Sequence, residues 1–99
     1  MPKTIKELQS VMVRQLRRKG FYPTGEKEAL LRIGEEVGEV FEAVREKWPK
    51  SKLELEVADV FWNLLRYCEL KNIDLEKSFL RKWGINERRP IRKKGKNSR

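Results

Sequence analysis

The sequence predicts an all-α protein of four helices, arranged most simply as a bundle or as half of one. Three observations lead to this fold class. Apolar residues recur at helical spacing in four segments, turn-forming residues separate these segments, and no segment alternates apolar and polar residues as a strand does. A chain of 99 residues forms one domain, and a domain of this size buries only about 60–65% of the surface that its unfolded chain exposes. Oligomerisation would therefore help to complete its core.

The first predicted helix ends at about Lys19. Thr4, with Glu7 three residues later, has the pattern of a capping box at the helix start. Gly20 is a typical C-terminal stop, because glycine readily adopts the left-handed conformation there. The basic residues before it complement the negative end of the helix dipole.

The second predicted helix spans about residues 26–47, with Thr24 as a candidate cap. Seven residues form its apolar stripe: Ala29, Leu30, Ile33, Val37, Val40, Phe41 and Val44. Glu36 lies at the border of this stripe and should be partly buried, whereas Glu42 should be exposed.

The third predicted helix, about residues 52–71, follows a break at Pro49, and Ser51 with Glu54 suggests a second capping box. This helix is apolar on nearly every side, which is typical of a central, buried helix. One polar line nevertheless follows it: Glu56, Asp59, Asn63 and Arg66.

The fourth predicted helix starts after Asp74, a good N-cap, and runs from about Leu75 to Trp83 or as far as Arg88, before Pro90. Residues 1–90 are therefore expected to form the domain. Residues 91–99 are basic and almost without apolar side chains, and we expect them to be disordered on their own.

Composition excludes several kinds of chemistry. The chain has no histidine and a single cysteine, so histidine-based catalysis, histidine zinc sites and an internal disulfide framework are ruled out. No apolar run approaches the roughly 20 residues of a membrane span, and the start lacks the apolar core of a signal peptide. We therefore expect a cytoplasmic protein without membrane contact.

Charge is distributed unevenly along the chain. The net charge is +9, yet residues 25–72 hold eleven acidic and eight basic side chains. If the second and third helices form an antiparallel pair, the acidic group before Pro49 can face the one after it. Converging carboxylates suit a hard divalent cation. Salt bridges to Arg32 or Arg66, or a plain solvated helix face, would also account for these acidic residues.

Two short motifs resemble the signature of the MazG-like nucleotide pyrophosphohydrolases, which is E-E-x-x-E followed by E-x-x-D: EEVGE at residues 35–39 and EVAD at residues 56–59. This resemblance implies a MazG-type fold of four helices and hydrolysis of a nucleoside triphosphate to the monophosphate and pyrophosphate, as in nucleotide-pool house-cleaning. It implies Mg²⁺, with Mn²⁺ as a substitute, held by four ligands: Glu36, Glu39, Glu56 and Asp59. Glu35 would be an outer ligand or would orient the attacking water.

The resemblance extends to the fourth helix, where Lys82, Asn86 and Arg89 match a K-x-x-x-N-x-x-R pattern. These residues would lie on one helix face and meet the substrate's phosphates. Asn63 could hydrogen-bond a base or sugar, support a metal ligand, or be a satisfied core amide. The family also implies a homodimer or homotetramer.

A second class of function stays open on sequence grounds. The charge of +9 and the basic C-terminal residues suit a helical module that binds nucleic acid without catalysis. No motif for base readout is present, so we expect such binding to be weak, non-specific and carried mainly by residues 91–99.

Overall fold

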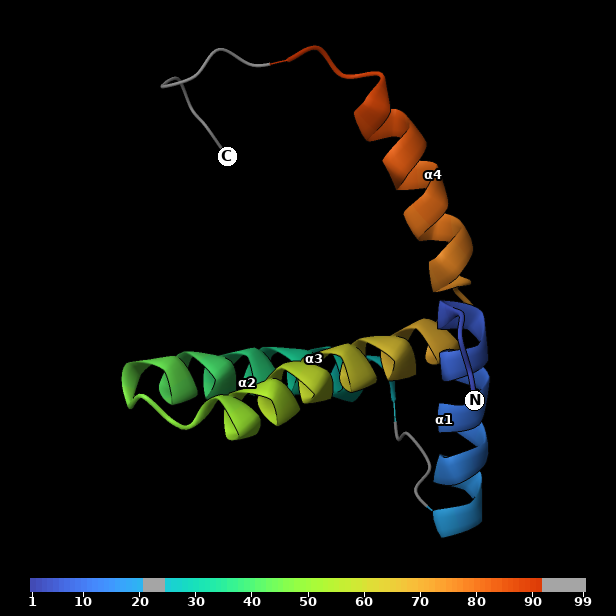
Figure 1. Cartoon of the computed structure of the whole chain (residues 1–99). Helices are drawn as coiled ribbons and strands as arrows, with labels where there is room; N and C mark the ends of the chain where they lie inside the picture. The colour runs from blue at the N-terminus through green and yellow to red at the C-terminus, as the bar shows by residue number, and fades with distance from the viewer. Residues whose placement is uncertain (21–24, 92–99) are drawn as a thin grey trace.

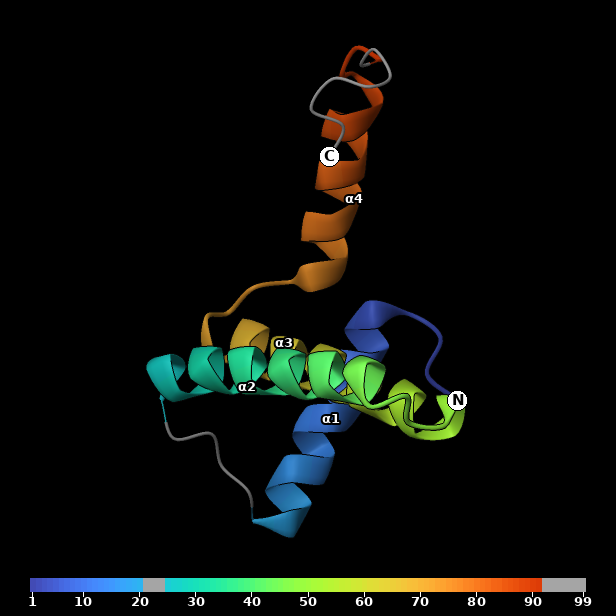
Figure 2. The same cartoon turned by 90° about the vertical axis from the view of Figure 1, so that its left-hand side faces the viewer.

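The computed structural model describes residues 1–20 and 25–91, and within these residues it contains four α-helices and no β-strand. The helices are α1 (Ile5–Lys19), α2 (Glu26–Arg45), α3 (Lys50–Leu70) and α4 (Leu75–Glu87). α2 and α3 form an antiparallel hairpin, α1 crosses one end of it, and α4 extends away (Figure 1). Figure 2 shows the same arrangement from the side. The predicted all-α class is confirmed.

Three predicted helix ends are confirmed by their hydrogen bonds. The Glu7 amide donates to Thr4 Oγ1 at 3.0 Å, and the Thr4 amide donates to Glu7 Oε1 at 2.9 Å, which completes the capping box of α1. Gly20 ends α1 with a φ of 76°, a left-handed conformation that favours glycine. Asp74 caps α4 by accepting a hydrogen bond from the Lys77 amide at 3.1 Å.

The second predicted capping box is wrong. α3 begins at Lys50, with Pro49 as its N-cap, so Ser51 lies inside the first turn and no side chain caps the helix. The reason is backbone geometry, because Pro49 already has the extended ψ of 147° from which a helix can start. α2 ends two residues earlier than predicted, at Arg45, and its N-cap is Gly25. The predicted cap Thr24 lies outside the described residues.

The face of α2 that meets α3 differs in part from the predicted stripe. Its buried residues are Ala29, Glu36 and Ala43, spaced seven apart and hence on one side of the helix. Glu36 is therefore buried, as predicted, and Glu42 is half-buried where exposure was predicted. Four residues of the stripe are instead exposed: Leu30, Val37, Phe41 and Val44. The apolar stripe is wider than the contact that one neighbouring helix can cover.

α3 is not buried on every side, contrary to the prediction. Leu55, Val57 and Phe61 are exposed, because α2 and α1 make most of its contacts and α4 leaves the hairpin. The radius of gyration is 16.4 Å, against about 13 Å for a compact chain of this length. In the single chain, the helices are thus only partly covered by one another.

Side-chain hydrogen bonds hold α1 against the end of the hairpin at which α3 finishes. Gln9 Nε2 donates to Glu69 Oε1 at 3.1 Å and to the Ile73 carbonyl at 3.4 Å. Met12, only 1% exposed, supplies the apolar part of α1's buried side. None of the described helices is both long and apolar enough to cross a membrane.

Candidate metal centre

Three carboxylates from the two helices of the hairpin meet at one point. Glu36 comes from α2, and Glu56 and Asp59 come from α3, where they are three residues apart and share a face. One oxygen of each lies within 4.8 Å of the others. The antiparallel pairing of α2 and α3 therefore brings the two halves of the acidic motif together.

Two further glutamates border this trio. Glu39 lies near Glu36 and Glu56, because its negative charge is, after burial, a cause of the raised pKa of both carboxyl groups. Glu35 is on the exposed side of α2, where its Oε1 lies 3.9 Å from Arg32 Nη1. The predicted roles of Glu39 as a further ligand and of Glu35 as an outer group remain predictions.

Glu36 is the most buried of these carboxylates, at 6% exposure. Burial raises the pKa of its carboxyl group above the ordinary value, and the negative charges of Glu39 and Asp59 raise it further. Arg32 opposes this shift, since its Nε lies 3.6 Å from Glu36 Oε2. The salt bridge to Arg32 considered from sequence is therefore present, and it occupies one carboxylate oxygen.

Glu56 has no such cation. Burial raises the pKa of its carboxyl group, and the negative charges of Glu39, Asp59 and Glu36 act in the same direction. Within the described part of the chain, Glu56 makes no salt bridge. The cluster therefore holds more negative charge than its arginine neutralises.

The donor set fits a hard divalent cation. Glu36 Oε1 and Glu56 Oε1 are both buried and have no hydrogen-bond partner among the described residues. An orphaned buried acceptor is costly unless something compensates it. Mg²⁺ is bound by carboxylate and water oxygens, and Glu36, Glu56 and Asp59 each offer one carboxylate oxygen within 4.8 Å of the others.

Asn63 lies one turn after Asp59 and is 6% exposed. Its Nδ2 donates to the Asp59 backbone carbonyl at 2.8 Å. This bond agrees with a satisfied core amide that braces the helix beneath a ligand. Its predicted contact with a base or sugar remains a prediction.

The basic residues predicted on the fourth helix lie apart from the carboxylates in the single chain. Lys82 and Asn86 are exposed on α4, which extends away from the hairpin (Figure 1). Arg89 lies two residues beyond the last helical residue, Glu87, so the three do not share one continuous helix face. Their role in phosphate binding remains a prediction, and it would need these side chains to reach a metal centre on another copy of the chain.

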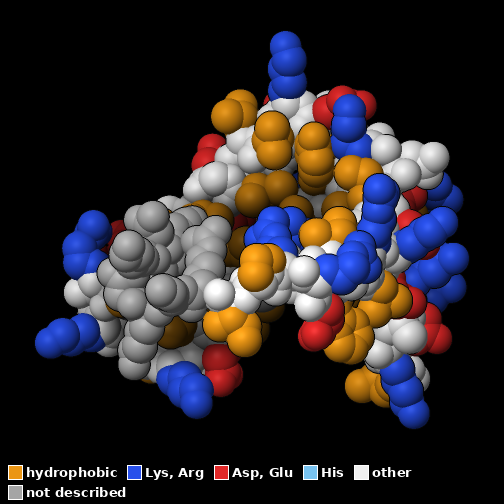
Figure 3. Space-filling view, turned by 90° about the horizontal axis from the view of Figure 1, so that it is seen from above, with side chains coloured by type: hydrophobic (Ala, Val, Ile, Leu, Met, Phe, Trp, Pro, Cys, Tyr) orange, Lys and Arg blue, Asp and Glu red, His pale blue; other side chains and the backbone are white. Residues whose placement is uncertain are grey.

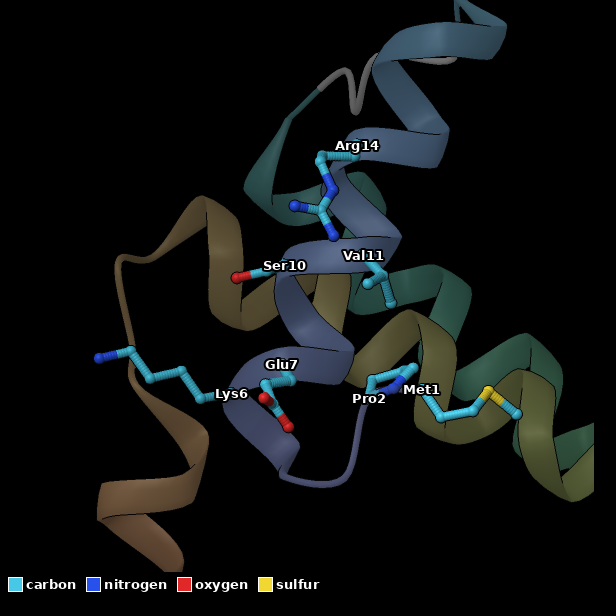
Figure 4. A pocket seen from close by; sticks show the side chains of 7 residues that line it. All are labelled: Met1, Pro2, Lys6, Glu7, Ser10, Val11 and Arg14. Carbon is cyan, nitrogen blue, oxygen red and sulfur yellow. The ribbon is translucent and has the colours of Figure 1, made fainter.

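A separate cavity of about 560 Å³ lies along α1 and is a poor candidate for the same chemistry. Seven residues from the N-terminus and one side of α1 line it (Figure 4): Met1, Pro2, Lys6, Glu7, Ser10, Val11 and Arg14. Its single carboxylate, Glu7, is held by the amides of Lys3 and Thr4, which lower the pKa of that group. The carboxylate trio is therefore the stronger candidate for a functional site.

The chain also matches a known family over most of its length. The family model of the MazG nucleotide pyrophosphohydrolase domain matches residues 24–91, which include α2, α3 and α4. Comparisons with curated proteins and with solved structures give no match. The matched region contains the whole carboxylate cluster and the predicted basic residues of α4, and the chain belongs to the MazG nucleotide pyrophosphohydrolase family.

Proposed function

We propose that this protein is a Mg²⁺-dependent nucleoside triphosphate pyrophosphohydrolase that releases the monophosphate and pyrophosphate, with a house-cleaning role in the nucleotide pool. The observation that carries the proposal is the meeting of Glu36, Glu56 and Asp59 within 4.8 Å, with two buried oxygens that have no partner among the described residues. Membership of the MazG family supports the reaction type.

Each carboxylate has a role that follows from its position. Glu36, Glu56 and Asp59 would hold the cation, with Glu39 beside them as a fourth ligand. A bound Mg²⁺ would neutralise phosphate charge and make a water a better nucleophile, so no histidine is required. Glu35 is exposed next to the cluster. There its carboxylate can accept a hydrogen bond from the attacking water and so orient that water.

The substrate's phosphates would be contacted from the other side by Lys82, Asn86 and Arg89. Asn63, whose amide donates to the Asp59 carbonyl, would support a metal ligand. In the single chain α4 is remote from the cluster (Figure 1). The proposal therefore includes a homo-oligomer, a dimer or tetramer, in which α4 of one copy approaches the hairpin of another.

Incubation with a panel of nucleoside triphosphates, with Mg²⁺ and with EDTA, tests the reaction. We expect pyrophosphate as the inorganic product, turnover that requires the cation, and partial support by Mn²⁺. Orthophosphate as the sole inorganic product, or turnover that resists EDTA, would contradict the proposal.

A further inference from the structure

Two arginines border a second cavity, immediately beside the carboxylate cluster. This cavity has a volume of about 360 Å³, and five residues of α2 and one of α3 line it: Glu28, Ala29, Leu31, Arg32, Glu35 and Arg66. Arg32 connects it to the cluster through its 3.6 Å contact with Glu36. The cavity and the candidate metal centre therefore share a wall.

Arg66 differs from Arg32 because it has no acidic partner among the described residues. Its Nε is buried and has no hydrogen-bond partner, and the residue forms no ion pair with any residue that the structure describes. A buried guanidinium donor without an acceptor is costly, so the position favours an anion brought from outside the chain. The salt bridge to Arg66 that would explain the acidic cluster is thus absent among the described residues.

The positions along α3 set the distance between the two sites. Asp59, Asn63 and Arg66 lie at i, i+4 and i+7, on one side of the helix. At a rise of 1.5 Å per residue, the backbone of Arg66 is about 10 Å along the axis of α3 from that of Asp59, and the backbone of Arg32 is about 6 Å along the axis of α2 from that of Glu36. A phosphate chain bound at the cluster can extend over this distance into the cavity.

The lining of the cavity suits the phosphate end of a nucleotide better than the base. Among the residues that the structure describes, its lining has no aromatic side chain on which a base could stack, and the charged groups are two guanidinium groups and two carboxylates. Guanidinium groups match phosphate oxygens in a planar, two-pronged geometry. The carboxylates of Glu28 and Glu35 balance the charge of the arginines, so an anion should bind here only together with a divalent cation.

We propose that Arg32 and Arg66 form a subsite for the pyrophosphate end of the substrate, which holds the leaving group while the carboxylate cluster holds the cation. This inference rests on the proposed function and adds the two residues that receive the β- and γ-phosphates. Arg32 also pairs with Glu36 Oε2, which leaves Glu36 Oε1 without a hydrogen-bond partner among the described residues.

Calorimetric titration of the full chain with inorganic pyrophosphate, in the presence of Mg²⁺, tests the subsite without requiring turnover. Arg66→Met should weaken pyrophosphate binding about tenfold or more, because a charge-assisted pair is lost. Arg45→Met is the matched control, since Arg45 is exposed on α2 and pairs only with Glu46 among the described residues. It should leave the affinity unchanged, and neither variant should change Mn²⁺ binding.

Two further measurements keep the inference open to refutation. Arg66→Lys, which keeps the charge and loses the planar fork, should bind pyrophosphate with intermediate affinity and covers the case that Arg66→Met does not fold. Nucleoside monophosphate affinity should be the same in wild type and Arg66→Met. Wild-type pyrophosphate affinity in the folded Arg66 variants, or an equal loss for the monophosphate, would overturn the subsite. A wild-type protein that hydrolyses no triphosphate but shows these pyrophosphate effects would overturn the proposed function alone.

Discussion

Glu36 shares the buried face of α2 with two alanines. Ala29 and Ala43 precede and follow it by seven residues, and all three are buried against α3. An apolar residue there would satisfy packing without the cost of burying a charge. The glutamate at this position is therefore explained by ligand binding better than by stability.

Glu39→Gln and Asp59→Asn should each lower turnover about a hundredfold or more, because each removes a charge from the cation site. Neither should unfold the protein, and relief of repulsion should stabilise the metal-free form slightly. Steady-state kinetics and thermal melts check both effects. Glu54→Gln is the control, since Glu54 is exposed on the same helix and should tolerate the change. Near-wild-type rates in both ligand variants would eliminate the proposed site.

The metal-free protein should lose stability as pH rises from about 4.5 toward neutrality. Glu36 and Glu56 have pKa values raised in the fold by burial and by Glu39 and Asp59, and only Glu36 is partly relieved by Arg32. A group with a raised folded pKa binds its proton more tightly in the native state. Its stabilisation is therefore complete below the unfolded pKa and disappears as pH rises through the folded pKa.

Scanning calorimetry in EDTA across this range measures that slope. Glu56→Gln should flatten it, and Mg²⁺ should reduce it, because the cation favours the ionised carboxylates. Glu7, with its lowered pKa, acts in the opposite direction and only below its ordinary value of 4.5, outside this window. A melting temperature that stays constant in EDTA would contradict the raised pKa values.

At the scale of elements, local sequence signals predicted helix ends well where a side chain makes the cap. Thr4 and Asp74 form the predicted hydrogen bonds. Ser51 does not, because the backbone geometry of Pro49 starts α3 before Ser51 can serve as a cap. A pattern of residue types cannot distinguish these cases without knowledge of where the preceding turn places the chain.

This difference between two similar motifs can be measured. Thr4→Ala should lower the free energy of unfolding by about 1 kcal/mol, since it removes the acceptor for the Glu7 amide. Ser51→Ala should change it by less than about 0.5 kcal/mol, because Ser51 is exposed and caps nothing. Denaturant titration of both variants gives the comparison, and a larger loss for Ser51→Ala would reverse the assignment of the two caps.

The meeting of Glu36, Glu56 and Asp59 follows from the pairing of two elements, so the convergence of the two acidic groups could be expected from the sequence. Helical spacing places Glu56 and Asp59 on one face, and the short break between α2 and α3 favours an antiparallel pair. Sequence could not show that Arg32 is engaged by Glu36 while Arg66 is not. That outcome depends on the axial rotation of α2 against α3, which the seven-residue spacing of small residues sets.

At the scale of the whole molecule, the single chain exposes much apolar surface. Phe41 on α2 is 70% exposed and Trp83 on α4 is 57% exposed. Figure 3 shows hydrophobic side chains on the outer surface, with Lys and Arg beside them. Extensive exposed apolar surface marks an interaction site in most soluble proteins. The sequence pattern placed Phe41 in the apolar stripe of α2, and in the proposed homo-oligomer a second copy of the chain would cover both residues.

Phe41→Glu should therefore shift the protein toward the monomer without unfolding α2. The side chain contacts little within its own chain, so its loss costs association more than folding. Sedimentation at micromolar concentration, with circular dichroism alongside, measures both. Exchange of exposed Glu54 for Gln again provides a surface control. A wild-type protein that sediments as a monomer would contradict the proposed homo-oligomer.

Mn²⁺ binding followed by electron paramagnetic resonance tests most directly whether the carboxylates of α2 and α3 hold a divalent cation. Wild type and Glu54→Gln should bind Mn²⁺ with the same affinity and release it to excess Mg²⁺. Glu56→Gln removes the negative charge of a carboxylate whose Oε1 is buried and has no hydrogen-bond partner among the described residues. This change should weaken Mn²⁺ binding about tenfold or more. Equal Mn²⁺ affinity in Glu56→Gln and Glu54→Gln would contradict the account.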